Sequence, residues 1–166
     1  MSSMVYLLTS LPALTFAQVP PISLSEFYND AAKQLSQKRY NQLSDIDIRS
    51  SGKIVQRQFK SIENLLSGIA KDIAEMRLAR NENRLPKTEF LSHEIMNANP
   101  LEREQEIMKR MWDELESIEV GKTFTFTEVV VYKLKLQVLI RLNSFNKKRG
   151  AEVLASVVNP NNNEED

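Results

Sequence analysis

Proline placement constrains this chain more than any other feature of its sequence. No proline occurs over 22–85 or over 101–159, and the six prolines lie near the start, between these stretches and near the end. An interior proline costs a helix about 3 kcal/mol, so long proline-free stretches are what a helical protein requires. The glycines fall mainly where turns are expected, and only Gly68 lies inside a periodic segment. The sequence therefore predicts an all-α fold.

The clearest periodic signal lies over 53–80. Its apolar positions follow one another at intervals of four and three residues, and we call them the apolar stripe: Val55, Phe59, Ile62, Leu66, Ile69, Ile73 and Met76. This spacing predicts near-parallel packing against another helix. At about 1.5 Å per residue the helix is roughly 40 Å long, the diameter expected of a compact chain of this size. We expect a long central helix whose stripe is either ordinary bundle packing or a seam for another protein or a second copy.

The C-terminal half predicts a helical hairpin. Asn99 is a good N-cap and Pro100 suits the first helical turn, so one helix begins here and ends at Gly121. A capping box at Thr125 begins the next helix, which we expect to reach about Asn146. The two helices then form a C-terminal helical hairpin about Gly121.

One segment of this hairpin is open to a second interpretation. Residues 129–138 alternate apolar and polar side chains as a strand would, although the segment is longer than an ordinary strand. A short helix over 151–158 and a disordered tail over 159–166 are expected to follow. The predicted fold is an elongated helical bundle, a single domain over 1–158, with one long central helix (about 53–80) and the C-terminal hairpin.

The N-terminal segment also has two interpretations. Residues 1–25 carry no charge, and the apolar run over 5–11 resembles the core of a secretory signal cleaved after residue 17. No basic residue precedes that run and Pro12 interrupts it, so we favour a strand-like or irregular segment packed on the core, ending at residues 20–21. The run is too short to span a bilayer.

Local signals organise the segment that follows. The spacing of Ser23 and Glu26 is that of a capping box, which predicts a helix reaching about Ser36. Residues 45–52 are rich in Asp and Ser and are expected to be a connection.

Charge is segregated between the two hairpin helices. Residues 102–119 contain seven acids and three bases, a net charge of −4, whereas residues 133–149 contain six bases and no acid, a net charge of +6. In an antiparallel hairpin these charges would flank the shared seam and favour one orientation more than they would add stability. The alternative is that Lys147, Lys148 and Arg149 bind an acidic partner surface or phosphate.

Catalytic chemistry is mostly excluded by composition. The chain has no cysteine and a single histidine, which removes disulfides, thiolate nucleophiles and most metal and triad chemistry. Glu89, His93 and Glu94 could offer a two-point metal contact, but they match no metal-binding motif. The 22 basic and 22 acidic residues balance, which argues against nucleic-acid binding. We therefore expect no enzyme activity, no cofactor and no metal.

Five segments carry a resemblance to a known family. They are residues 6–12, 21–23, 99–104, 111–115 and 132–137. They resemble an uncharacterised bacterial family encoded within V/A-type ATPase gene clusters, which is in turn distantly similar to the C subunit (d in eukaryotes) of rotary ATPases. That subunit is an all-helical socket that sits on the membrane ring and receives the central stalk.

The resemblance implies a non-catalytic subunit or assembly factor of a V/A-type ATPase. Its expected partners are the rotor stalk and the membrane ring, and it would be cytoplasmic and peripheral to the membrane through those protein partners only. The alternative is a free-standing or exported helical adaptor, possibly a homodimer through the apolar stripe. The residues expected to form an interface are the apolar stripe together with Lys147, Lys148 and Arg149.

Overall fold

The structure is a computed structural model that describes residues 3–49 and 57–158. Within these residues the fold is all-helical, with six α-helices, two 3₁₀ helices and no strand. The elements are α1 (Ser3–Ser10), α2 (Leu24–Gln34), α3 (Gln37–Asp45), η1 (Arg57–Phe59), α4 (Lys60–Asn81), η2 (His93–Asn97), α5 (Pro100–Glu119) and α6 (Phe126–Val158). The expected disordered tail over 159–166 lies outside the described residues.

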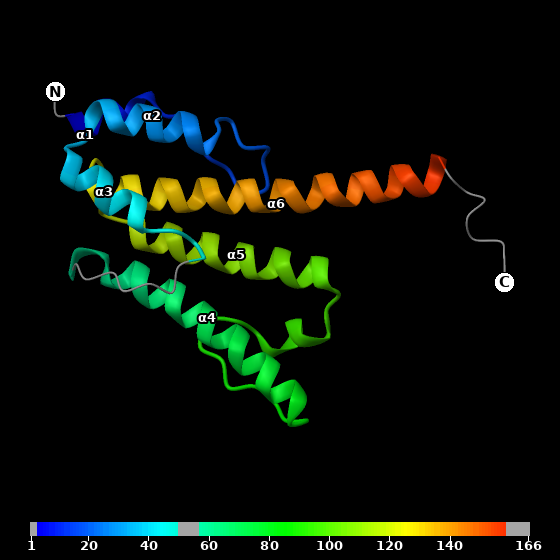
Figure 1. Cartoon of the computed structure of the whole chain (residues 1–166). Coiled ribbons are helices and arrows are strands. Elements are labelled where there is room, and N and C mark those ends of the chain that lie inside the picture. The colour runs from blue at the N-terminus through cyan, green and yellow to red at the C-terminus, as the bar shows by residue number, and fades with distance from the viewer. Residues whose placement is uncertain (1–2, 50–56, 159–166) are drawn as a thin grey trace.

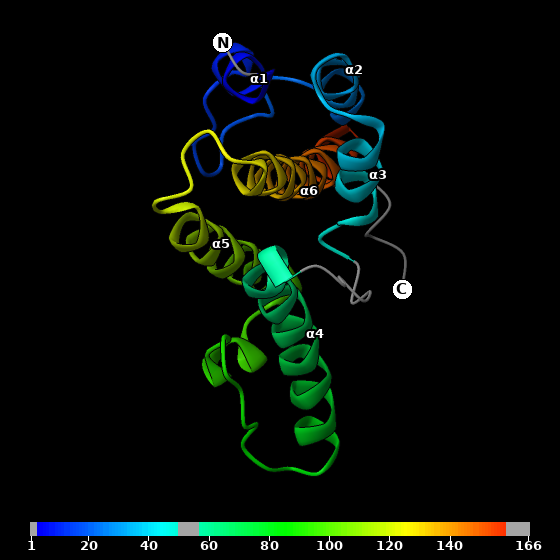
Figure 2. The ribbon, with the colours of Figure 1, turned by 90° about the vertical axis from the view of Figure 1, so that its left-hand side faces the viewer.

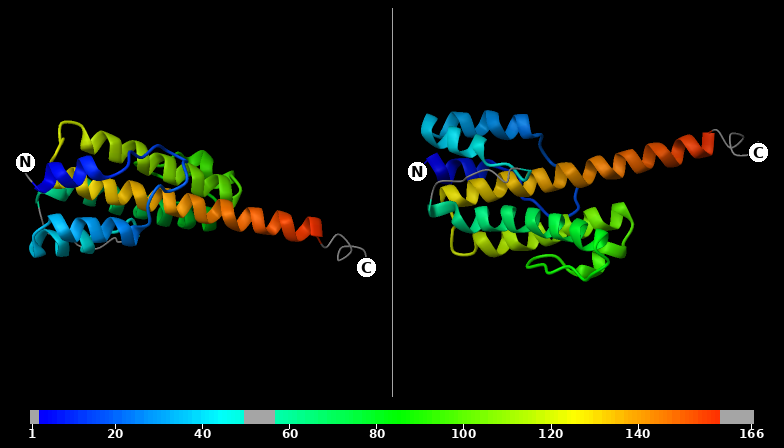
Figure 3. Two further views of the ribbon diagram at one scale, coloured as in Figure 1. Left: turned by 90° about the horizontal axis from the view of Figure 1, so that it is seen from above. Right: turned by 60° about the horizontal axis from the view of Figure 1, so that its bottom comes forward.

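The helices form layers on two sides of α6. Figure 1 shows α1 and α2 on one side of this helix, with α5 and then α4 on the other. The end-on view in Figure 2 shows α3 at the flank of α6, below α2. Contacts join α6 to α5 and to α2, and α4 packs on α5. Both views in Figure 3 show α6 extending beyond the other helices at its C-terminal end.

The expected helix starts are confirmed by their caps. The side chains of Ser23 and Asn99 accept hydrogen bonds from the amides three residues later, at 3.1 and 2.9 Å. Thr125 Oγ1 accepts from the amide of Glu128 at 3.4 Å, and the Glu128 carboxylate accepts from the amide of Phe124. Ser36, which was expected near the end of one helix, instead caps a further helix, α3.

The N-terminal segment is helical at its start, so the strand-like or irregular interpretation is wrong for Ser3–Ser10. Met4, Leu7 and Leu11 are spaced three and four residues apart and are buried on one face, which is the spacing of an amphipathic helix. Beyond α1 the chain is irregular up to α2, as expected. The Tyr132 hydroxyl donates to the carbonyl oxygen of Pro12 at 2.6 Å, which ties this segment to α6.

The segment open to a strand interpretation is helical, and the helix is longer than expected. Residues 129–138 belong to α6, which continues without a break to Val158 instead of ending near Asn146. Lys133 and Leu134 are buried, as are Val131 before them and Lys135 and Leu136 after them, because α6 packs against layers on both sides. A helix that is buried on both sides does not need to confine its apolar residues to one face, as an amphipathic helix does. The alternation of apolar and polar residues in this segment is therefore no evidence for a strand.

The helix expected over 53–80 differs from the observed one at its start. Residues 57–59 form η1, α4 begins at Lys60 and ends at Asn81, and residues 53–56 lie outside the described part of the chain. The position between the two layers belongs to α6, whereas α4 packs on the outer side of α5 (Figures 1 and 2).

The segment that follows α4 folds back onto it. The Asp72 carboxylate is 4% exposed and accepts hydrogen bonds from the amides of Glu89, Phe90 and Leu91 at 2.6–3.0 Å. The ring of Phe90 then lies against Gly68, where a Cβ would be only 2.2 Å from the ring atom Cε2. This close approach explains why a glycine stands in the middle of α4.

Candidate interaction surfaces

The apolar stripe lies mostly inside this chain. Phe59 and Ile62 are fully buried, Leu66, Ile69 and Met76 are at most 7% exposed, and Ile73 is partly buried. Val55, the remaining member, lies outside the described residues. The ring of Phe59 packs edge-on against that of Phe126, the first residue of α6, with centroids 5.5 Å apart. The chain's own core therefore covers most of the stripe, as the bundle interpretation expects.

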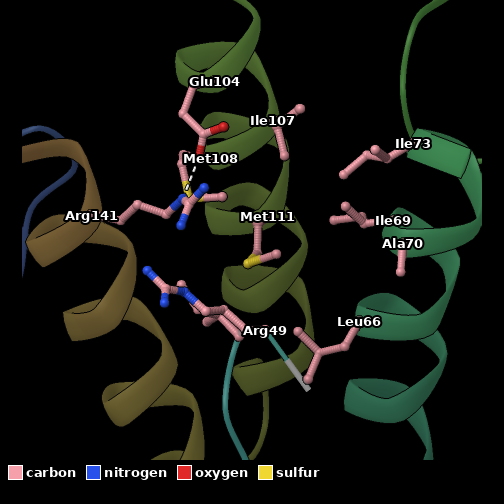
Figure 4. Close-up of a pocket in the computed structure, with 11 residues that line it drawn as sticks. Arg49, Leu66, Ile69, Ala70, Ile73, Glu104, Ile107, Met108, Met111 and Arg141 are labelled. Carbon is pink, nitrogen blue, oxygen red and sulfur yellow. Dashed lines mark hydrogen bonds and ion pairs between the residues drawn. The ribbon is translucent and has the colours of Figure 1, made fainter. Parts of the chain in front are cut away.

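A groove remains between α4 and α6 over the surface of α5. Figure 4 shows the first of its two hollows, with side chains of α5 between those of α4 and α6. Leu66, Ile69 and Ile107 line this hollow, which has a volume of about 300 Å³. Arg141 points across it from α6 and pairs with Glu104 of α5. Arg49, which follows α3, also lines it.

The groove continues into a larger hollow toward the C-terminal end of α4. This second hollow has a volume of about 630 Å³. It shares four lining residues with the first hollow: Ile73, Glu104, Ile107 and Arg141. Guanidinium-bearing side chains from three helices also line it, and we call it the arginine hollow after them: Arg77 and Arg80 of α4, Arg103 of α5 and Arg141 of α6. A cation-rich groove with an apolar lining is suited to binding another molecule by packing and charge together.

The expected charge pairing between α5 and α6 is present in part. Lys135 Nζ lies 2.8 Å from a carboxylate oxygen of Glu119 and 3.7 Å from one of Glu116, and Arg141 pairs with Glu104. Lys147 and Lys148 are exposed in the C-terminal part of α6. Arg149 belongs to the same helix, and its side chain lies outside the described part of the structure.

The sequence did not reveal that two bases of α6 are buried, Lys133 at 1% and Lys135 at 7% exposure. Lys133 points toward α3. Its ammonium group donates to the carbonyl oxygens of Leu43, at 2.7 Å, and Ile46, and lies 5.2 Å from the ring centroid of Tyr28. Burial lowers the pKa of Lys133 to about 8. No local pattern sets Lys133 apart from Lys135 and Gln137, the other polar residues of this alternating segment.

The residues considered for metal binding are not assembled into a site. Glu89, His93 and Glu94 are all exposed; Glu89 lies in the segment before η2, and the other two begin η2. Across residues 3–49 and 57–158, no three His, Cys, Asp or Glu side chains are grouped so that they could hold a metal ion.

Comparison with known proteins adds no relative. No protein-family model matches the chain, and no curated protein or solved structure matches it either. The resemblance to the ATPase-associated family therefore depends on the five segments alone. Of the helices in the described part of the chain, none is both long enough and apolar enough to cross a membrane.

Proposed function

We propose that this protein is a non-catalytic subunit or assembly factor of a V/A-type rotary ATPase, with a role like that of the C subunit between rotor stalk and membrane ring. One observation supports this most directly. Three of the five segments that carry the resemblance, residues 99–104, 111–115 and 132–137, lie on α5 with its N-cap Asn99 and on α6. These two helices pack against each other more extensively than any other pair of described elements.

The proposal includes the finer arrangement expected from the sequence. In the ATPase the protein would be an elongated helical bundle in which α4 is a long helix and α5 and α6 form a C-terminal hairpin. Its partners would be the rotor stalk and the membrane ring, and its helix faces would hold these two parts in alignment. The protein would be cytoplasmic and held at the membrane by those protein partners.

The exposed basic end of α6 is the first surface to assign to a partner. Lys147 and Lys148 are exposed in the C-terminal part of α6, and the C-terminal end of this helix extends past the other helices (Figure 3). A cationic helix end that projects from the bundle can contact an acidic surface without clashes from the rest of the chain, and such contacts favour correct orientation and fast association.

A tagged pull-down from gently solubilised membranes of the source cells tests the proposal. We expect near-stoichiometric recovery of rotor-stalk and ring subunits, identified by mass spectrometry, and reduced recovery after a high-salt wash because exposed charge contacts are screened. Lys147→Glu with Lys148→Glu should reduce recovery. The matched control is Lys33→Glu with Lys38→Glu, which makes the same charge change on α2 and α3 and should not.

Either of two results would refute this assignment. One is recovery of the protein alone, which would leave a free-standing adaptor. The other is recovery of ATPase subunits at the same trace level from cells that carry only the tag.

A further inference from the structure

The arginine hollow has an apolar interior. Its lining includes Ile73 and Met76 from α4, Ile107 from α5 and Phe145 from α6. Met76 and Ile107 are buried beneath the surface, whereas Ile73 and Phe145 are only partly covered. The volume of about 630 Å³ is within the range of about 300–1,000 Å³ found for ligand pockets. The hollow can therefore take up several apolar side chains from another molecule.

The charge of the lining is strongly one-sided. Four guanidinium groups line the arginine hollow, and the one carboxylate among its lining residues, Glu104, pairs with Arg141. Arg80 donates to the carbonyl oxygen of Met96 at 2.6 Å, and Arg103 donates to carbonyl oxygens of the same segment at 3.1–3.3 Å. These bonds fix the orientation of the two side chains but leave their charge in place.

The position of the hollow suits a helix. Residues of α4, α5 and α6 line it together, so an additional helix laid between α4 and α6 would contact three helices at once. On α4 the lining residues Ile73, Met76, Arg77 and Arg80 recur every three or four residues, so they form a continuous face. Amphipathic helices bind such grooves through apolar residues spaced in the same way.

From these observations we propose that the arginine hollow binds an acidic amphipathic helix of a partner protein. Leu or Ile side chains of that helix pack on Ile73, Met76 and Phe145, and Glu or Asp side chains on its flanks pair with the arginines. The concave, partly apolar lining favours a peptide over a membrane surface, which contacts projecting cationic faces. The inference rests on the proposed function only in treating the protein as a binding component, and it names the chemistry of one partner segment.

Fluorescence anisotropy with the full chain tests the proposal. The probe is a labelled helical peptide of about five turns, with Leu along one stripe and Glu on both flanks. The matched probe carries Lys in place of every Glu. We expect the Glu peptide to bind at least roughly tenfold more tightly than the Lys peptide and to lose affinity as the ionic strength rises above about 0.1 M.

Charge-reversal variants locate the binding site. Arg77→Glu with Arg80→Glu should weaken binding of the Glu peptide at least roughly tenfold, since two cations become anions. Lys33→Glu with Lys38→Glu changes the net charge by the same amount on α2 and α3, and should leave the affinity within about twofold. Phe145→Ala removes an apolar contact without changing charge and should weaken both peptides. Circular dichroism checks that each variant remains folded.

Two results would overturn the proposal. The first is equal affinity for the Glu and Lys peptides, and the second is unchanged Glu-peptide affinity in the folded Arg77→Glu, Arg80→Glu variant. If in the second case this variant also loses binding to phosphatidylserine vesicles, or loses self-association, the hollow serves a membrane or a second copy instead. If the pull-down recovers no ATPase subunits but the Glu peptide binds as expected, only the proposed function is refuted. If the pull-down recovers ATPase subunits but the Glu peptide does not bind, only the helix-binding site is refuted.

Discussion

Lys133 is the residue whose charge state depends most clearly on the fold. Its folded pKa of about 8 lies below the ordinary value of 10.5, and burial is the main cause. Between these two pH values the unfolded chain binds more protons than the native protein. The native state is therefore stabilised as the pH rises from about 8 toward 10.5, and below pH 8 the protein carries the full cost of the buried charge.

Lys133→Met should remove this pH dependence. Relative to the variant, the free energy of unfolding of the native chain should rise by about 2 kcal/mol between about pH 7 and pH 9.5, since one pKa unit corresponds to about 1.4 kcal/mol. Urea denaturation at a series of pH values measures the difference. Burial raises the pKa of Tyr28 and Tyr132 to about 12, so neither tyrosine ionises in the native protein in this range.

The matched control for this experiment is Lys71→Met, because Lys71 is exposed on α4. Its free energy of unfolding should follow that of the native chain at every pH. Parallel curves for the native chain and Lys133→Met would contradict the burial of this ammonium group.

Gly68 makes a second test at the level of single residues. Replacing a helical glycine by alanine normally stabilises a helix by up to about 1 kcal/mol. At this position the new Cβ would lie 2.2 Å from Cε2 of Phe90, so we expect Gly68→Ala to destabilise the protein by about 1–3 kcal/mol, as overpacking does. In a Phe90→Ala background the same change should be neutral or stabilising. Thermal denaturation of the native chain, the two single variants and the double variant measures these effects on stability. If Gly68→Ala changed the stability equally in both backgrounds, the contact between residue 68 and Phe90 would be excluded.

Among the elements, the segment that folds back on α4 depends on one carboxylate. The two carboxylate oxygens of Asp72 together accept three amide hydrogen bonds. Asp72→Asn leaves only one side-chain oxygen that can accept them, so we expect a loss of stability of about 2 kcal/mol. Amide hydrogen exchange at residues 89–91 should accelerate more than exchange within α4. Asp113→Asn, on the exposed side of α5, is the control. Uniform acceleration over both segments would indicate a general loss of stability instead.

Helix starts could be predicted from the sequence because their determinants are local. Ser23, Asn99 and Thr125 each cap the helix that follows them, through a bond that spans only three residues. The length of α6 was not predictable in this way. Gly150 follows the expected end near Asn146, but one glycine costs a helix only about 1 kcal/mol, which is too little to end it. The layers on both sides of α6 likewise depend on contacts between distant parts of the chain.

The surfaces were predictable to different degrees. The exposure of Lys147 and Lys148 agrees with the basic run in the sequence, and the burial of the apolar stripe agrees with its periodicity. The arginine hollow depends on how α4 and α6 lie relative to α5, which no local pattern specifies. A partial signal was present in α4, where Arg77 and Arg80 continue the face of Ile73 and Met76 at helical spacing.

At the scale of the whole molecule, α6 belongs to the core of both layers. On one side Lys133 bonds to the end of α3, and on the other Lys135 pairs with Glu119 of α5. Neither layer can separate without exposing one side of α6, whose residues Val129, Leu134 and Leu139 are fully buried. We therefore expect the α1–α3 layer and the α4–α5 layer to unfold together in a single cooperative transition.

Cavities introduced on opposite sides of α6 test this cooperativity. Leu43 of α3 and Leu115 of α5 are both fully buried, and replacing either by Ala should cost about 2–5 kcal/mol. In urea, the transition followed by Trp112 fluorescence, which reports on α5 and on the ring of Phe16 that packs against it with centroids 5.7 Å apart, should coincide with the transition followed by circular dichroism in both variants. The Leu43→Ala cavity lies in the other layer, yet it should shift the Trp112 transition as far as the circular dichroism transition. If Leu43→Ala split the two transitions and left the Trp112 midpoint unchanged, the layers would fold independently and α6 would not be a shared core.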